Sequence, residues 1–449
     1  MSRKRMSETS SEVGSRARRR IAFRLLPLVL AMYVVCYVDR ANVSFANLRM
    51  SADLGLSASA YGFGVGVFFV GYVLFEVPGA LIVERWSARK WMARIMITWG
   101  LITILTGFVH TPRQFYLARL FVGLAEASFF PGIIVYLTHW FRHSDRAKAI
   151  GFFYIGVPGA SVAGSLVASW LIGVHWRGIA GWRWLFITEG IPPIILGMIA
   201  LFYMTDWPRQ ARWLPQDERD WITRELEAEA RAKKQIRDYT IWEAFRDRQI
   251  VLLIVAWFLS LVSALAALYW MPIFIKRLSG LPDSKVALLI VLPGLLGIAG
   301  ILLNGWHSDK TGERRWHAAL PLLVAGLLYL LLLVPGIHFP LAMALLAVAA
   351  ALFYSYQPVF WSIPTMILCE SAAAACFGLI NSLGQLGGFV GPYAVGYLND
   401  RTGHHAASFA FIGTCFLLAG SVIPLLTIPK PETVQDRHLA SEQPLPARS

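Results

Sequence analysis

Charged residues are scarce in this chain. They make up 15% of its 449 residues, whereas 56% are hydrophobic and the mean hydropathy is +0.54. Ordinary soluble domains carry about 25% charged residues. The composition therefore excludes a conventional soluble domain and indicates a polytopic, all-α membrane protein.

The sequence also has few residues arranged for catalysis or metal binding. Of its ten histidines only His404 and His405 are adjacent, and no glycine-rich phosphate loop ending in Lys-Ser or Lys-Thr occurs. Four cysteines fall in or beside apolar runs, at no spacing typical of disulfides or zinc: Cys36, Cys369, Cys376 and Cys415. We expect no cofactor, no metal and no ATP-driven transport.

Long apolar runs are what the chain has in abundance. Each is long enough to cross about 30 Å of hydrocarbon, some of them with tilt. Pro335 to Pro340 is the only break between the ninth and tenth runs, so eleven spans are the alternative. The twelve runs are residues 21–46, 59–83, 91–110, 115–139, 147–173, 183–204, 249–275, 285–306, 317–338, 340–364, 374–398 and 406–428.

Positive charge is distributed unevenly along the chain. The 41 Lys and Arg residues give a net charge of +14, which in a soluble protein would suggest a nucleic-acid site. If the chain alternates across the membrane twelve times, most of them fall on the side of the N-terminus. The positive-inside rule then places both termini in the cytoplasm and explains the excess without nucleic acid.

A charged loop motif occurs twice, at residues 80–91 and 305–316. The first copy carries Glu84, Arg85 and Arg89, and the second has Asp309 and Arg314 at matching positions. A repeat at half the chain length predicts two homologous six-helix bundles. The expected organisation is a disordered cytoplasmic tail (1–20), an N-terminal bundle (21–204), a cytoplasmic linker with an amphipathic helix (205–248), a C-terminal bundle (249–428) and a second tail (429–449).

Two ionisable residues of opposite sign lie within the fourth run. Arg119 and Glu126 are seven positions apart, which places them on nearly the same helix face about 10 Å apart along the axis. Charges in a bilayer normally face a cavity or a partner. One interpretation is a structural ion pair with a neighbouring helix. The interpretation we favour is a substrate-binding cation and a titratable carboxylate on one wall of an aqueous path.

A second acid–base pair supports that interpretation. Asp39 and Arg40 are adjacent at the end of the first run, so they point about 100° apart and each should meet a different helix. The alternative places both at the outer interface, in contact with water. In the second run Glu76 shares a helix face with Tyr72, and its role is left open.

The repeated loop resembles the signature of the major facilitator superfamily between spans 2 and 3 and between spans 8 and 9. In that family the loop stabilises one conformational state. The second copy fits the pattern better, because the first has Ala80, Glu84 and Ser87 where the family has Gly, Asp and Gly.

Further stretches resemble the anion:cation symporter branch, whose bacterial members include tartrate, phthalate, hydroxyphenylacetate and sugar-acid permeases. The stretches are Tyr37 to Asn42, Phe75 to Pro78, Arg119 to Gly132, Gly181 to Phe186, Phe360 to Pro364 and Asn381 to Pro392. The resemblance implies proton-coupled uptake of a small organic anion across a bacterial inner membrane, by alternating access in a monomer. An efflux antiporter and, less favoured, a polytopic membrane enzyme are the alternatives.

The resemblance also implies roles for individual residues. Asp39 and Glu126 would couple protons, and Arg40 and Arg119 would bind the anion. Softer assignments are made for further substrate contacts: Tyr37, Tyr72, Trp361 and Asn381.

Overall fold

The computed structural model describes residues 2–142, 145, 156–233, 246–367 and 370–428. Nearly all of these residues are helical, and the sheet found among them is a single antiparallel hairpin. Its strands, β1 (His175–Trp176) and β2 (Ile179–Ala180), pair His175 with Ala180. The fold is therefore all-α, as the sequence predicts.

The first half of the chain forms one bundle. Its helices are α1 (Ser2–Leu54), α2 (Ala58–Arg85), α3 (Ala88–Thr106), α4 (Pro112–Glu126), α5 (Phe129–Thr138), α7 (Gly156–Leu171), α8 (Gly181–Glu189) and α9 (Ile191–Tyr203). The second half forms the other bundle. Its helices are α12 (Arg248–Ser279), α13 (Asp283–Leu289), α14 (Val291–Thr311), α15 (Arg315–Leu331), α16 (Phe339–Ile367), α17 (Glu370–Gln385), α18 (Gly387–Thr402), α19 (Ala406–Val422) and the 3-10 turn η2 (Ile423–Leu425).

The described helices can be grouped into twelve consecutive segments, in line with the twelve predicted runs. Among the described residues, eight segments are long and apolar enough to cross a membrane by length and composition, and α7 and α15 are shorter apolar helices. The ninth and tenth predicted spans are separate helices, α15 and α16, divided by residues 332–338. This division favours twelve spans over eleven, because α15 ends at Leu331 and α16 begins only at Phe339, after a turn that includes Gly336 at φ 77°.

The connection between the bundles contains the predicted amphipathic helix. The described part of this connection includes the 3-10 turn η1 (Pro208–Gln210) and the helix α10 (Gln216–Lys233). Residues 234–245 of this connection and the expected tail 429–449 lie outside the described residues.

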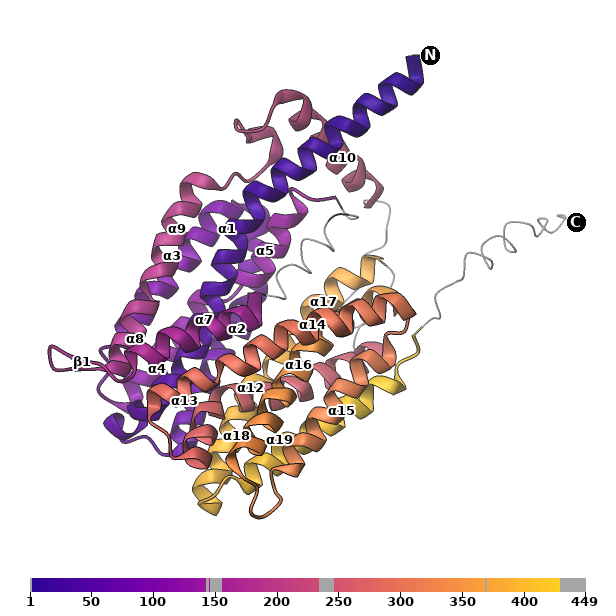
Figure 1. The fold of residues 1–449 in the computed structure, drawn as a ribbon. Coiled ribbons are helices and arrows are strands. Elements are labelled where there is room, and N and C mark those ends of the chain that lie inside the picture. Colours follow the sequence, from indigo (N-terminus) through magenta and orange to yellow (C-terminus); the bar gives the residue numbers. More distant parts are fainter. Residues whose placement is uncertain (1, 143–144, 146–155, 234–245, 368–369, 429–449) are drawn as a thin grey trace, which may run out of the picture.

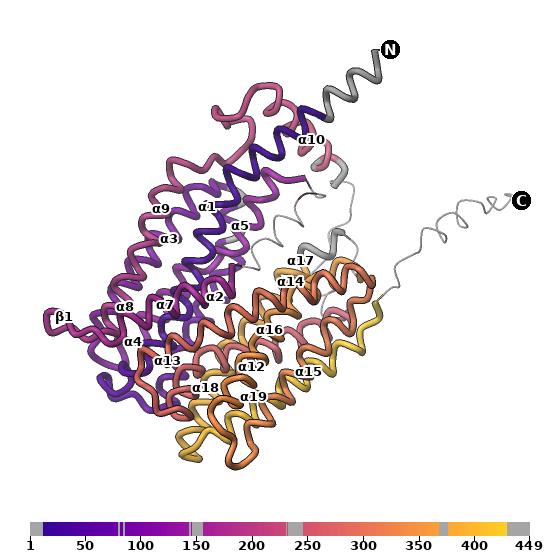
Figure 2. The backbone as a smooth tube through the Cα atoms, in the orientation of Figure 1, coloured from indigo at the N-terminus to yellow at the C-terminus, as the bar shows by residue number. Residues whose placement is uncertain are grey.

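The prediction of a disordered tail over residues 1–20 is wrong, because α1 begins at Ser2. The part of α1 that carries Arg16 and Arg20 lies against α10, as Figure 2 shows. Arg16 forms a 3.0 Å ion pair with Asp217, and Arg20 approaches Glu218 at 3.5 Å. These contacts hold the beginning of α1 against α10.

The two bundles meet along helix pairs drawn from each half, chiefly α2 with α18, α7 with α13 and α14, and α1 with α12 (Figure 1). Close approach needs glycine at two points. A Cβ on Gly62 would collide with the carbonyl of Pro392, and a Cβ on Gly396 with that of Ala58. We call the end of the molecule that carries β1 and β2 the hairpin end, and the end that carries α10 the linker end.

The bundles are bonded to each other at the hairpin end. Arg49 forms an ion pair with Asp283 at 2.8 Å, and the backbone N–H groups of Ala58 and Ser59 donate to the carboxylate of Asp400 at 3.0 and 2.7 Å. Asp400 therefore caps the N-terminus of α2 from the opposite bundle.

Candidate functional site

Ionisable side chains are buried inside the first bundle, in helices that pack around α1. Within the membrane-spanning part of the described chain, six of them are at most 9% exposed: Asp39, Arg40, Glu76, Arg119, Glu126 and Glu189. Charged groups are costly in this environment unless they are paired or line a pathway. The question is which of them are paired.

Arg40 and Glu126 form the central ion pair. Arg40 Nε lies 2.5 Å from Glu126 Oε1, and the thiol of Cys36 donates to the same oxygen at 3.2 Å. The side chains of Arg40 and Glu126 are 10% and 0% exposed. The pair joins α1 to α4, and the alternative of Asp39 and Arg40 in water at the outer interface is wrong.

Aromatic rings surround the guanidinium of Arg40. Its Cζ lies 5.3 Å from the centre of the Tyr37 ring, 5.0 Å from Tyr72 and 5.5 Å from Phe68. Such contacts stabilise a cation away from water. Both tyrosines singled out in the sequence are therefore beside the ion pair, and Phe68 is a further member that the sequence analysis missed.

Arg119 does not share the carboxylate of Glu126 in any described ion pair. It is 2% exposed and its Cζ lies 4.8 Å from the centre of the Phe68 ring. Its Nε and Nη2 atoms have no hydrogen-bond partner among the described residues. No ion pair of Arg119 is formed among the described residues, and a buried guanidinium with free N–H donors can bind an anion.

Asp39 faces a different set of groups from Arg40. Asn42 Nδ2 donates to Asp39 Oδ1 at 3.0 Å, and Arg119 and Glu126 lie within electrostatic reach of the carboxylate. The adjacent acid and base thus point to different neighbours, as the helical geometry predicts.

The helix that carries Arg119 and Glu126 is interrupted directly after Glu126. The predicted continuous run 115–139 is divided into α4 and α5, and Ser128 has a left-handed backbone with φ 67°. Its hydroxyl accepts from Trp91 Nε1 at 3.2 Å and donates to the Ala127 carbonyl. Interrupted helices inside a membrane protein occur where backbone is covered by protein or lines a cavity.

Glu76, whose role the sequence left open, connects the two bundles. Asn381 Nδ2 and Ser382 Oγ, both on α17, donate to its two carboxylate oxygens at 2.6 Å each. Asn381 therefore reaches the first bundle, as its expected role requires. Trp361 does not: its ring contacts are with Trp257, Phe360 and Phe377 of its own bundle.

The two copies of the charged loop bond within their own bundles at the linker end. In the second copy, Arg314 forms a 2.6 Å ion pair with Asp309. In the first copy, the backbone N–H of Arg89 donates to Asp206 at 2.8 Å, an acid that the sequence analysis did not single out. The side chains of Glu84 and Arg85 lie outside the described part of the structure.

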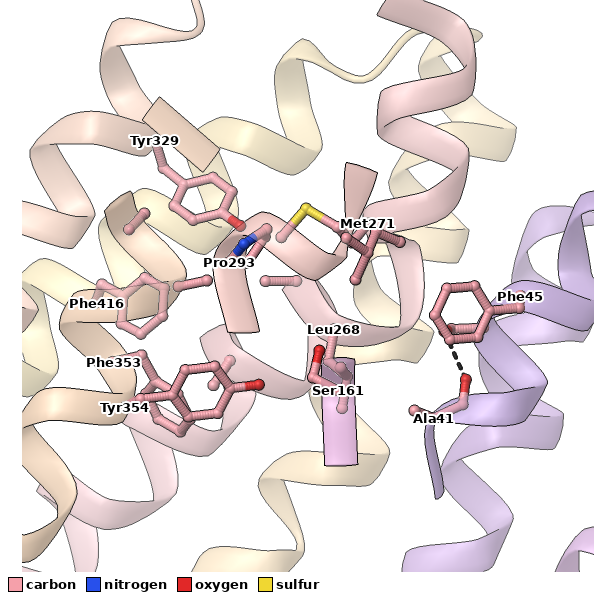
Figure 3. Close-up of a pocket in the computed structure, with 16 residues that line it drawn as sticks. Ala41, Phe45, Ser161, Leu268, Met271, Pro293, Tyr329, Phe353, Tyr354 and Phe416 are labelled. Atoms are coloured by element: carbon pink, nitrogen blue, oxygen red, sulfur yellow. Dashed lines mark hydrogen bonds between the residues drawn. The ribbon is translucent and has the colours of Figure 1, made fainter. Parts of the chain in front are cut away.

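A cavity lies next to the charged cluster and is lined by both bundles (Figure 3). Its walls are mostly apolar, and the hydroxyl groups of Tyr329 and Tyr354 are directed towards its middle. Ala41 and Phe45 of α1 line it, but the six buried ionisable residues do not. An organic anion needs a cation, so we assign the candidate site to the charged cluster rather than to this cavity.

Two helical bundles that meet through buried polar groups, with a buried guanidinium and carboxylates inside the first bundle, are typical of a membrane transporter. The chain belongs to the Major Facilitator Superfamily, whose sequence model matches residues 29–392.

Individual relatives agree with this assignment. A protein of Agrobacterium vitis, provisionally named a tartrate transporter, is 39% identical over 94% of this chain and 97% of its own. A quinolone resistance transporter of Acinetobacter baumannii is 35% identical over 95% and 98%. Among solved structures, a D-xylose-proton symporter has the same fold, with a TM-score of 0.71, 16% identity, and coverage of 91% of this chain and 98% of that one.

Proposed function

We propose that the protein takes up a small organic anion together with protons, by alternating access across a bacterial inner membrane. The substrate class is a tartrate-like hydroxy acid, a sugar acid or an aromatic carboxylate. The observation that carries the proposal is the buried guanidinium of Arg119. Its Nε and Nη2 have no hydrogen-bond partner within the described part of the chain, and the ion pair of Arg40 with the carboxylate of Glu126 lies in the same cluster.

The ion pair supplies a means of coupling. While Glu126 is ionised, its carboxylate forms an ion pair with the guanidinium of Arg40. A proton on Glu126 or Asp39 reduces the negative charge around the two arginines, and a substrate carboxylate then takes the vacated position. The loaded site is closer to neutral, which lowers the cost of moving it between the two sides of the membrane. Tyr37, Tyr72, Trp361 and Asn381 are the proposed further contacts of the substrate.

The described contacts support an inward-facing state. If both termini are cytoplasmic, the hairpin end is external, and there the bundles are joined through Asp283 and Asp400. At the linker end, the charged loops bond within their own bundles. We propose that these loops, with Glu84, Arg85, Arg89, Asp309 and Arg314, stabilise the opposite state when the linker end closes, and that one monomer suffices for transport.

Efflux is the second candidate, because a relative of 35% identity is named a quinolone resistance transporter. Uptake and efflux differ in the direction in which a proton gradient drives the substrate. Proteoliposomes with labelled tartrate or a labelled quinolone, and with the proton gradient in either direction, separate the two functions.

The coupling step is tested with Glu126→Gln and Asp39→Asn, which imitate the protonated side chains. Both should abolish accumulation of labelled tartrate against a pH gradient. At least one should retain exchange in vesicles preloaded with tartrate, because exchange requires no net proton movement. If both variants concentrate tartrate with wild-type pH dependence, these carboxylates are not the proton sites.

A further inference from the structure

Glu189 is a buried acid to which the mechanism above gives no role. It is the last residue of α8 and is 6% exposed. Neither of its carboxylate oxygens has a hydrogen-bond partner among the described residues. A carboxylate held in this way inside a membrane is strongly disfavoured, and taking up a proton is its simplest route to neutrality.

The position of Glu189 is fixed by close helix packing. A Cβ on Gly190 would collide with the carbonyl of Gly100 in α3, and a Cβ on Gly100 with that of Gly190. The end of α8 is therefore held against α3. On α1, which packs against α8, Asp39 lies within electrostatic reach of Glu189, and the side chain of Asn42 lies beside the Glu189 carboxylate without forming a hydrogen bond of good geometry to it.

The other elements packed against α8 bring no cation to Glu189. Between Gly156 and Leu171, α7 has no titratable residue, and α9 has only Tyr203, at its far end. The basic residues of α3 all precede Gly100 by at least six positions, the nearest being Arg94. Asp39 is thus the ionisable neighbour that matters.

The charge balance of the buried cluster identifies Glu189 as the acid left over. Glu126 is paired with Arg40, and Glu76 accepts two hydrogen bonds from α17. Asp39 accepts from Asn42 and lies within reach of Arg119. Within the described spans, four carboxyl groups face two guanidinium groups, so full ionisation would leave two negative charges without compensation.

A single proton on Glu189 would neutralise its carboxylate and would also supply a hydrogen-bond donor for Asn42 Oδ1. Asn42 Oδ1 is a buried acceptor without a donor among the described residues, whereas Asn42 Nδ2 already donates to Asp39. A protonated carboxyl group gains an O–H donor, which is what this acceptor lacks. We propose that Glu189 is a proton-binding site connected to Asp39 through Asn42. A proton that leaves a Glu189 oxygen and binds an Asp39 oxygen exchanges one carboxylate for another, with no net change of charge in the cluster.

Infrared spectroscopy tests the proton directly. Purified wild-type protein in nanodiscs at neutral pH should show the C=O band of a protonated carboxyl group, and Glu189→Gln should reduce the intensity of this band. The matched control is Glu225→Gln on α10, a partly exposed acid that pairs with Arg142 and should leave the band unchanged. A band of unchanged intensity in Glu189→Gln overturns the proposal.

Transport supplies the second test, and it rests on the proposed proton coupling. Glu189→Gln should abolish the pH dependence of tartrate uptake and retain tartrate exchange, and Glu189→Asp should restore part of the pH dependence. Wild-type pH dependence in Glu189→Gln overturns the role of Glu189. If wild-type protein takes up no tartrate, the proposed substrate fails, but the infrared result still decides whether Glu189 holds a proton.

Discussion

At the scale of single residues, the molecule distinguishes two arginines that look equivalent in the sequence. Arg40 forms an ion pair with Glu126, whereas the Nε and Nη2 donors of Arg119 have no hydrogen-bond partner among the described residues. The planar guanidinium can hold a carboxylate through two parallel hydrogen bonds, and a lysine ammonium cannot reproduce that geometry. We therefore propose Arg119 as the group that first receives the anion.

We therefore expect Arg119→Lys to bind tartrate more weakly while the protein still folds. Loss of a hydrogen bond to a charged group costs about 1.5–3 kcal/mol, or about 10- to 100-fold in affinity. Isothermal titration calorimetry with purified protein measures the change. Arg113→Lys is the control, since Arg113 is an exposed residue on the same helix. Wild-type affinity in Arg119→Lys would leave Arg119 without a role in binding.

At the scale of secondary-structure elements, hydrogen bonds between α2 and α17 connect bundles that are far apart in the sequence. Glu76 accepts from Asn381 and Ser382, and it is 3% exposed. A buried carboxylate that loses a donor is left partly unsatisfied, so the cost exceeds that of an ordinary hydrogen bond.

Ser382→Ala should therefore lower the thermal stability of the protein, by about 1.5–3 kcal/mol for a hydrogen bond to a carboxylate. Ser421→Ala is the matched control, because the exposed Ser421 hydroxyl bonds only the Leu417 carbonyl of its own helix. Melting temperatures in one detergent measure both changes. Equal melting temperatures for the two variants would contradict a stabilising role for the contact.

The cap that Asp400 places on α2 is sensitive to pH. Partial burial raises the pKa of this carboxyl group, but the Ser59 hydroxyl and the backbone N–H groups of Ser59 and Ala58 more than offset this, and the pKa is lowered below its ordinary value. Because the pKa of Asp400 is lower in the folded state than in the unfolded state, its ionisation stabilises the folded protein. This contribution is fully present above the unfolded pKa, about 3.9, and is lost as the pH falls through the folded pKa.

Asp400→Asn should consequently be less stable than wild type at neutral pH, and the difference should shrink as the pH falls below about 4 and disappear below the lowered folded pKa of Asp400. Melting temperatures measured from neutral to acidic pH test this. Asp220→Asn on α10, an exposed acid, should show no such pH-dependent difference. A difference for Asp400→Asn that is independent of pH would exclude the carboxylate as its source.

At the scale of the whole molecule, the uneven distribution of the 41 basic residues predicts the orientation in the membrane. Cysteines introduced at positions 2, 225 and 445 should resist a thiol reagent that cannot cross the membrane, when the reagent is added to intact cells. A cysteine at His404, in the loop before α19, should react and serves as the positive control. Labelling of any of the first three from outside would reverse the assigned orientation.

The sequence by itself determined the architecture and the candidate residues. Hydrophobic runs of spanning length and a duplicated loop predict two bundles, because the bilayer permits few other arrangements of such a chain. Helical periodicity also predicts that Asp39 and Arg40 meet different neighbours. These predictions depend on the spacing of residues along the chain, which can be read from the sequence alone.

Only the tertiary structure decided which charged groups are paired. Arg119 and Glu126 share a helix, yet Glu126 bonds Arg40 of α1, and Glu76 bonds α17 of the other bundle. No local pattern marks Ser128 as the point where the fourth span breaks, or Glu189 as an acid that has no hydrogen-bond partner in the described structure. Ion pairing and burial depend on the distances between helices that are remote along the chain, and those distances are set by packing rather than by sequence spacing.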